Sequence, residues 1–101
     1  MTIAGLWSEW NNPETGKPQS TCTMIITEAN DFVAGVHDRV PVILEEKQFD
    51  EWLDNGVVPT SLLKVLKPAG ERILACHPVS KRVNSSRADG DDATLITEVA
   101  L

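Results

Sequence analysis

The sequence predicts one small α+β domain with antiparallel or mixed strand pairing and short flanking helices. Three observations lead to this class. The chain has 101 residues, 42% of them apolar, which is enough for a single small core. Short segments rich in β-branched residues are interspersed with short segments of helical spacing. Their order is strand, strand, helix, strand, two helices, strand, strand, so we expect a mixed or antiparallel sheet with open edges.

Two strands are expected first. Residues 2–10 alternate as a strand does, and residues 11–19 are rich in Asn, Pro and Gly, which indicates a loop. The segment Thr21–Thr27 carries the strongest strand signal, because β-branched residues dominate it and alternate positions from Cys22 onward are apolar.

Helices are expected on either side of a third strand. Thr27 is the expected N-cap of a short amphipathic helix that ends near Val36 and is followed by a turn at 37–39. The continuous apolar segment Pro41–Leu44 predicts a strand buried on both faces. Two more helices are expected over 45–54 and 59–67, the first ended by Asn-Gly and the second by Pro and Gly.

The rest of the chain predicts two more strands, over 72–77 and 94–100, with a polar loop over 85–93 between them. Cys22 and Cys76 both lie in apolar stretches, so we expect buried free thiols in a reducing compartment. With no apolar run of about 20 residues and no signal-peptide pattern at the N-terminus, we expect a cytoplasmic protein without a membrane partner, nucleoid-associated if the source is bacterial.

Charge is unevenly distributed along the chain. The net charge of -6 argues against a protein that coats nucleic acid indiscriminately. Residues 1–50 carry eight acidic and three basic side chains, whereas residues 64–87 carry six basic side chains and one acidic. This basic sector can steer a polyanion to one face, although a solvated surface with clustered charges explains it more simply.

The most chemically suggestive segment is His37-Asp38-Arg39, at the start of the expected buried strand. A histidine donates or accepts a proton near neutral pH, and Arg39 can hold a phosphate beside it. The alternative is a turn histidine bonded to a backbone carbonyl, with Arg39 paired to Asp38 or Glu45. Spacing alone does not decide between them.

Other constellations are weaker. Two cysteines and two histidines suggest zinc, but no C-x₂-C or H-x₃-H pair is present, so we expect neither a metal nor any other cofactor. His77 is expected to be a packed, hydrogen-bonded histidine. No feature places either cysteine beside His37 as a nucleophilic pair. Glu9, between two tryptophans, could act as an acid but is more commonly an exposed glutamate.

Five linked segments resemble the SOS response-associated peptidase (SRAP) family, in the family's order and at similar spacings. They are Ala4-Gly5-Leu6-Trp7, Thr21 to Asn30, His37 to Leu44, Trp52-Leu53, and Pro78-Val79-Ser80-Lys81-Arg82-Val83-Asn84. The resemblance covers nearly the whole chain and corresponds to the C-terminal half of the family's domain. It implies a partial β-barrel-like sheet core flanked by helices.

The resemblance also implies a DNA-repair function. Members bind single-stranded DNA and react covalently with abasic sites, through an N-terminal cysteine that forms a thiazolidine with the sugar aldehyde and is credited with an autopeptidase activity. His37 matches the family's acid–base histidine, and Arg39 matches an arginine that contacts DNA phosphate. Lys81, Arg82 and Asn84 match a basic loop that helps to shape the DNA site.

The family's nucleophilic cysteine, oxyanion-binding asparagine and catalytic glutamate belong to the N-terminal half, which this sequence lacks. Glu9 lies in the later Ala-Gly-Leu-Trp motif and does not take the glutamate's role. We therefore expect no independent cross-linking, lyase or peptidase activity from this chain without a partner half. Two alternatives remain open: a non-catalytic module that binds single-stranded DNA, and a half-domain that self-associates through its open sheet edges.

Overall fold

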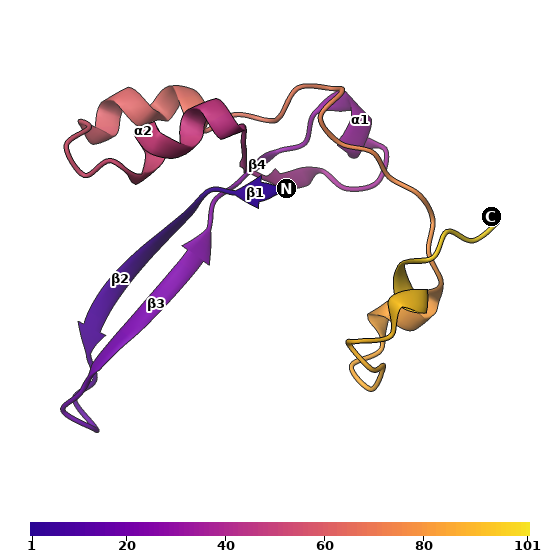
Figure 1. Ribbon diagram of the computed structural model, residues 1–101, viewed down its shortest axis with the longest axis horizontal. Helices are drawn as coiled ribbons and strands as arrows, with labels where there is room; N and C mark the ends of the chain where they lie inside the picture. The colour runs from indigo at the N-terminus through magenta and orange to yellow at the C-terminus, as the bar shows by residue number, and fades with distance from the viewer.

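The computed structural model describes all 101 residues and shows the α+β class with short antiparallel pairs and no closed barrel (Figure 1). The strands are β1 (Thr2–Ile3), β2 (Gly5–Asn11), β3 (Pro18–Met24), β4 (Ile26–Glu28), β5 (Arg39–Pro41) and β6 (Ile43–Leu44). The α-helices are α1 (Asp31–Ala34) and α2 (Phe49–Leu53). The 3₁₀ helices are η1 (Glu46–Gln48), η2 (Pro59–Val65), η3 (Lys81–Asn84) and η4 (Ala93–Ile96).

The three strand pairs meet at one junction. β1 pairs with β6, β2 with β3, and β4 with β5. The consecutive strands β1–β2, β3–β4 and β5–β6 form three extended segments, and each segment changes its pairing partner once along its length. A cycle of three backbone hydrogen bonds closes the junction: Ala4 N–H donates to the Val42 carbonyl (2.8 Å), Val42 N–H to Ile25 (2.9 Å), and Ile25 N–H to Ala4 (3.0 Å). The junction satisfies backbone groups that the partner exchange would otherwise leave unbonded.

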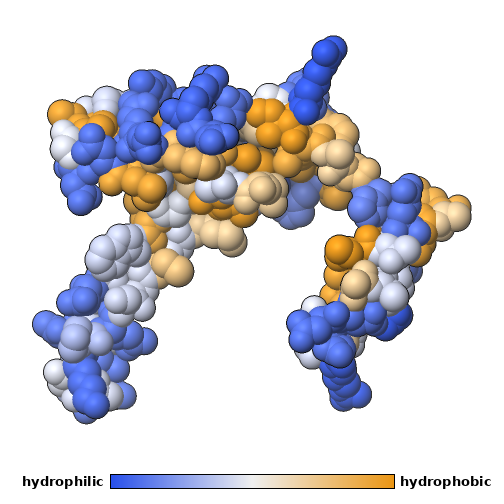
Figure 2. Space-filling model, viewed as in Figure 1, coloured by the Kyte–Doolittle hydropathy of each residue, from blue (hydrophilic) through white to orange (hydrophobic).

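The core is small and lies at this junction. Ala4, Val42, Leu44 and Val65 form the buried cluster, with Ile25, Phe49 and Trp52 packed against it. The expected strand over 41–44 is buried on one face only, because Val42 and Leu44 are buried whereas Pro41 and Ile43 are half-buried. Val42 also divides it into β5 and β6. Figure 2 shows apolar side chains on the surface of the central body around this core and a more hydrophilic hairpin arm extending from it.

The β2–β3 hairpin projects from the junction as an isolated two-stranded arm (Figure 1). All fourteen residues of the two strands are exposed. The expected loop is shorter than predicted, because the strands extend to Asn11 and from Pro18. Gly16 takes the left-handed conformation (φ 67°) that the tight turn requires.

A segment from later in the chain holds the first helix. Asn30, not the expected Thr27, is the N-cap of α1, and its Oδ1 accepts from Val33 N–H (2.9 Å). Its Nδ2 donates to the Ala69 carbonyl (3.0 Å). The Glu71 carboxylate accepts the N–H groups of the next two residues, Asp31 and Phe32. The Asn30 side chain is thus a link across 39 residues of sequence.

The two strands expected after residue 71 are not present. Residues 72–77 run without regular structure, and 93–96 form η4, with only an isolated bridge from Val79 to Glu98. In Figure 1 this C-terminal region lies apart from the junction, where it has no neighbouring strand to pair with. Apolar alternation alone does not make a strand when no partner edge is available.

The expected burial of both cysteines is also wrong, since Cys22 and Cys76 are exposed free thiols. Cys22 lies on the hairpin, neither face of which is covered, and Cys76 lies in the irregular segment. His77 is exposed too, although its Nε2 does form a hydrogen bond with the Ile96 carbonyl oxygen (2.9 Å).

The molecule is extended for its length. Its Cα radius of gyration is 17.7 Å, against about 13 Å for an ordinary domain of 100 residues. Its accessible surface of 8413 Å² exceeds by about 2,700 Å² the area expected of a compact monomer of this mass. Only six residues are buried. None of its helices has the length and apolar character needed to cross a membrane.

Candidate functional site

His37 lies at the turn between α1 and β5. The turn forms because α1 ends at Gly35, after which the His37 N–H still donates to the Val33 carbonyl (2.9 Å). The chain then enters β5, where Ala29 N–H donates to the Asp38 carbonyl (2.9 Å). The imidazole remains 67% exposed, so it is available to an external ligand.

The Nδ1 atom of His37 faces its own turn. It lies 3.0 Å from the Arg39 amide nitrogen, 3.2 Å from the Arg39 carbonyl oxygen and 3.2 Å from the Asp38 Oδ1 atom. The Arg39 N–H donates to Nδ1 in the tautomer that carries the ring proton on Nε2. Nε2 makes no hydrogen bond within the chain, so it is the nitrogen that can give a proton to a substrate.

His37 and Arg39 line the same shallow hollow. Its volume is about 330 Å³, and Ile26, Val40 and Pro41 complete its wall. Arg39 makes no ion pair, although Glu28 is its register partner on β4. Asp38 contacts His37 instead, and Glu45 pairs with Lys47 (3.0 Å). An uncompensated guanidinium two residues from an exposed imidazole can hold an anion beside a proton donor.

Lys81, Arg82 and Asn84 are all exposed on η3, and none of them lines this hollow. Arg82 is already engaged: its guanidinium lies 2.6 Å from the Asp92 carboxylate and 3.2 Å from the Thr94 hydroxyl. The structure thus brings two of the five expected site residues together and places the other three on a separate C-terminal arm (Figure 1).

Asp92 is the one group in the chain whose pKa clearly shifts. Hydrogen bonds from the Thr94 side chain (2.6 Å) and the Thr94 amide (2.9 Å) hold the pKa of the Asp92 carboxyl below its usual range, and the Arg82 guanidinium adds to this effect. The same bonds cap η4, so Asp92 joins η3 to η4.

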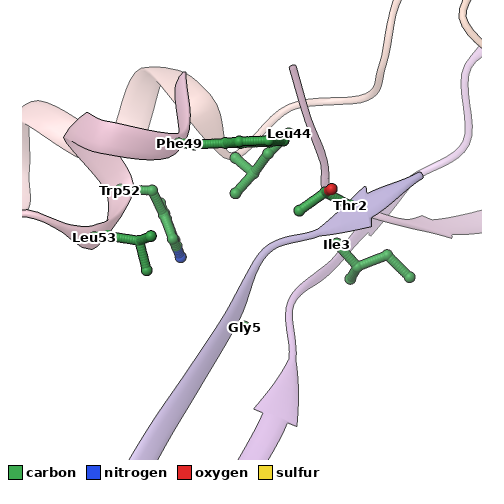
Figure 3. Close-up of a pocket in the computed structure, with 7 residues that line it drawn as sticks. All are labelled: Thr2, Ile3, Gly5, Leu44, Phe49, Trp52 and Leu53. Carbon is green, nitrogen blue, oxygen red and sulfur yellow. The ribbon is translucent and has the colours of Figure 1, made fainter. Parts of the chain in front are cut away.

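A second cavity is apolar and was not expected from the sequence. It has a volume of about 290 Å³ and lies between β1 and α2 (Figure 3). Its lining residues are Thr2, Ile3, Gly5, Leu44, Phe49, Trp52 and Leu53. Phe49 and Trp52 pack against the core cluster, whereas Leu53 at the end of α2 is 76% exposed. With Thr2 as its only polar side chain, the cavity is suited to packing rather than to acid–base chemistry.

Neither cysteine lines the His37 hollow, and no group of three or more acidic, histidine or cysteine side chains is arranged to hold a metal ion. Cys22 lies on the face of the hairpin, and Cys76 lies in an apolar hollow against α1. The hollow therefore has an acid–base group and a cation but no nucleophile.

Comparisons with known proteins agree with the sequence motifs. Residues 1–86 match the family model described as SOS response associated peptidase (SRAP). The chain is 36% identical over 103 residues to the abasic site processing protein HMCES of Gallus gallus, covering 100% of this chain and 30% of that protein. It is 40% identical over 88 residues to the abasic site processing protein YoqW of Bacillus subtilis (strain 168), covering 86% of this chain and 39% of the relative.

The fold also occurs in a crystal structure of a protein from Bacteroides thetaiotaomicron. The TM-score is 0.85 at 21% identity, over 97% of this chain and 43% of that one. The arrangement of this chain therefore matches part of a larger solved structure. This chain spans between about a third and less than half of the length of these relatives.

Proposed function

Since this chain belongs to the SRAP family, we propose that it is part of a DNA-repair protein that processes abasic sites in single-stranded DNA. The observation that supports this most is the shared hollow of His37 and Arg39, with the Nε2 atom of His37 free of any hydrogen bond within the chain. The named relatives are abasic site processing proteins. A place in the cytoplasm, at the nucleoid if the source is bacterial, belongs to the same proposal.

In this proposal, His37 is the acid–base residue. An abasic deoxyribose is a cyclic hemiacetal, and it must open to an aldehyde before an amine can attack. The Nε2–H of His37 donates a proton to the ring oxygen as the C1–O bond breaks, and the C1 hydroxyl gives its proton to solvent water as it becomes the aldehyde. His37 then recovers a proton in the later steps.

The nucleophile is supplied from outside this sequence. By resemblance to the family, the aldehyde condenses with the amine and thiol of an N-terminal cysteine to give a thiazolidine, with loss of one water. Neither cysteine of this chain lies in the His37 hollow. We also propose that residues 1–101 form a single domain, the C-terminal half of an SRAP domain, which a partner half completes.

Arg39 is proposed to hold the phosphate next to the abasic sugar. Lys81, Arg82 and Asn84 are proposed to contact the backbone further along the strand. For Arg82 this requires exchange of the Asp92 carboxylate for a phosphate oxygen. Contacts of this kind carry no base preference, in keeping with a damage site that has no base.

The test is binding of a single-stranded oligonucleotide that contains one tetrahydrofuran abasic analogue, measured by fluorescence anisotropy at several salt concentrations. Arg39→Ala should weaken binding on the order of tenfold and lower the salt slope by about one. Lys17→Ala, on the tip of the hairpin, is the matched control and should change neither. Binding that does not depend on salt, or that loses as much with Lys17→Ala, would contradict the proposal.

A second function, non-catalytic DNA binding, is favoured by one observation: neither cysteine lines the His37 hollow, and a chain without a nucleophile can still bind DNA. In that non-catalytic alternative, His37→Ala would leave DNA binding unchanged, and no covalent adduct would form with either the unmodified chain or the variant. A denaturation-resistant adduct formed on a natural abasic site in the presence of the partner half, and lost in His37→Ala, would exclude it.

A further inference from the structure

The β2–β3 hairpin has two free edges, because the sheet that it forms contains no third strand. A free edge presents unbonded N–H and C=O groups and is a template for another strand. We propose that the β3 edge pairs with the β3 edge of a second copy of this chain, as an antiparallel, two-fold symmetric dimer. This inference does not depend on the DNA chemistry above, and it requires that the partner half proposed there leaves the β3 edge free.

Hydrogen-bond parity shows which residues of β3 face outward. The pairing of β2 with β3 runs without a bulge, and a backbone hydrogen bond lies just beyond each end of it: Ile25 N–H donates to the Ala4 carbonyl, and Asn12 N–H donates to the Lys17 carbonyl. Hydrogen-bonded pairs alternate with non-bonded pairs in an antiparallel ladder. The residues bonded across the hairpin are therefore the odd-numbered residues of β3 and the even-numbered residues of β2. The N–H and C=O groups of Ser20, Cys22 and Met24 consequently point away from β2, toward the free edge.

The two edges differ in charge. β3 has the sequence Pro-Gln-Ser-Thr-Cys-Thr-Met and carries no charged residue, so two copies meet without repulsion. The outward residues of β2 include Glu9. If two β2 edges paired with each other, Glu9 would lie opposite the Glu9 of the second copy, with like charges close together, or opposite its Gly5. Natural edge strands are commonly protected by charges or prolines, and β3 has only Pro18, at its far end. The β3 edge is therefore the self-complementary one.

The register follows from the same groups. A two-fold axis at Cys22 pairs Cys22 with the Cys22 of the second copy, and Ser20 with its Met24. Each of these residues has both an outward N–H group and an outward C=O group to form the hydrogen bonds between the copies. This register keeps Pro18, which has no N–H, outside the paired segment. Trp7 is the register partner of Cys22, so its side chain lies on the same face of the hairpin as that of Cys22. In the dimer, the Trp7 side chains of both copies therefore lie on one face of a four-stranded sheet; in the single chain this residue is 75% exposed.

The excess surface is large enough for such a dimer. Each chain exposes about 2,700 Å² more than a compact monomer of its mass, and stable homodimers bury about 2,000 Å² or more in total. The exposed apolar side chains on the hairpin are Leu6, Trp7, Trp10 and Met24. The arm that carries the free edge thus also carries apolar area to cover.

The experiment is sedimentation equilibrium from about 10 µM to 1 mM in the presence of a reductant. Ser20→Pro removes an outward amide from β3 without removing a bond to β2, and it should raise the dimer dissociation constant at least on the order of tenfold. Glu9→Pro is the matched control. Glu9 is the register partner of Ser20 and has its amide on the opposite edge, so this change should leave the constant within about twofold.

Two further measurements guard against a variant that fails to fold. Cys22→Glu places like charges across the axis, so it should weaken the dimer, and added salt should restore it. With oxidised glutathione as electron acceptor, the chain should form a covalent dimer that Cys22→Ser abolishes and Cys76→Ser retains, because bonded cross-strand Cα atoms lie about 5.5 Å apart.

A monomer across the whole concentration range would overturn the proposal. So would a dimer weakened by Glu9→Pro rather than by Ser20→Pro, or a covalent dimer that forms through Cys76. The abasic-DNA assays use Arg39 and His37, which lie outside the hairpin, so failure of one proposal leaves the other measurable.

Discussion

The Ala4 amide donates to the Val42 carbonyl over 2.8 Å, and both side chains are completely buried. This bond joins the first extended segment to the third at the point where each changes strand partner. Val42 belongs to the same segment as Arg39, three residues earlier. The junction therefore holds the strand from which the proposed phosphate contact projects.

Val42→Ala should destabilise the fold by about 2 kcal/mol, through lost burial and the cavity left at the junction. Chemical denaturation followed by tryptophan fluorescence measures the change, because Trp52 packs against the same cluster. Val36→Ala is the control, since that side chain is 80% exposed and its loss should cost under 0.5 kcal/mol or so. Equal losses for the two variants would show that the junction is not the core.

Gly5→Ala tests the close approach of β2 to β3. A Cβ on Gly5 would stand 2.9 Å from the backbone oxygen of Thr23, which cannot move without shifting the strand. We expect a loss of about 1–3 kcal/mol. Gly90→Ala meets no atom within 4 Å and should be neutral or slightly stabilising, as measured by the same denaturation curve.

Glu71→Gln tests the link between α1 and the later segment. The carboxylate accepts two N–H groups of the first turn of α1, and charged acceptors there are worth about 1 kcal/mol. Faster hydrogen exchange at Asp31 and Phe32 would be the local readout. Glu98→Gln, outside this contact, should leave those amides unchanged. Protection that persists in Glu71→Gln would assign the capping to Asn30 alone.

The His37 turn makes a spectroscopic prediction. In neutral His37 the proton should be on Nε2, because Nδ1 accepts the Arg39 N–H, and ¹⁵N chemical shifts of the ring distinguish the tautomers. Arg39→Pro removes that donor and should mix the tautomers. Arg39→Ala keeps the amide and should leave the tautomer as it is. A neutral ring protonated on Nδ1 in the unmodified chain would remove His37 Nε2 as the proposed proton donor.

The sequence predicted local features better than long-range ones. The strand over Thr21–Thr27 is present but interrupted at Ile25, and the apolar segment at 41–44 is present with one face buried. The helix stop after Leu53 is present too. Each of these features depends on a few neighbouring residues. The turn at His37 was also foreseen, because a helix end and a strand start flank it. In these places the local sequence is enough to determine the structure.

The errors at both cysteines and at the strand expected over 72–77 share one cause, which is burial that no element of the chain provides. Cys22 and Cys76 lie in apolar stretches and were expected inside, and residues 72–77 alternate as a strand does. The spacing of apolar residues indicates which face of a segment is apolar, but it does not show whether another element of the chain covers that face. Likewise, the η3 residues match a family motif, yet nothing in their spacing indicated that Asp92 would hold Arg82.

The C-terminal arm should respond to acid through Asp92. Its pKa is lowered in the folded chain by the two Thr94 hydrogen bonds and the Arg82 contact. The sign follows from linkage: these bonds stabilise the arm fully above the unfolded value, near 4, and the stabilisation is lost as pH falls through the lower folded value. NMR shifts of the Thr94 amide should report the loss of the η4 cap below about pH 4. Asp92→Asn should abolish this transition, while Asp89→Asn should leave it unchanged. A transition that survives Asp92→Asn would assign the acid response to another carboxylate and would free Arg82 from the restraint proposed here.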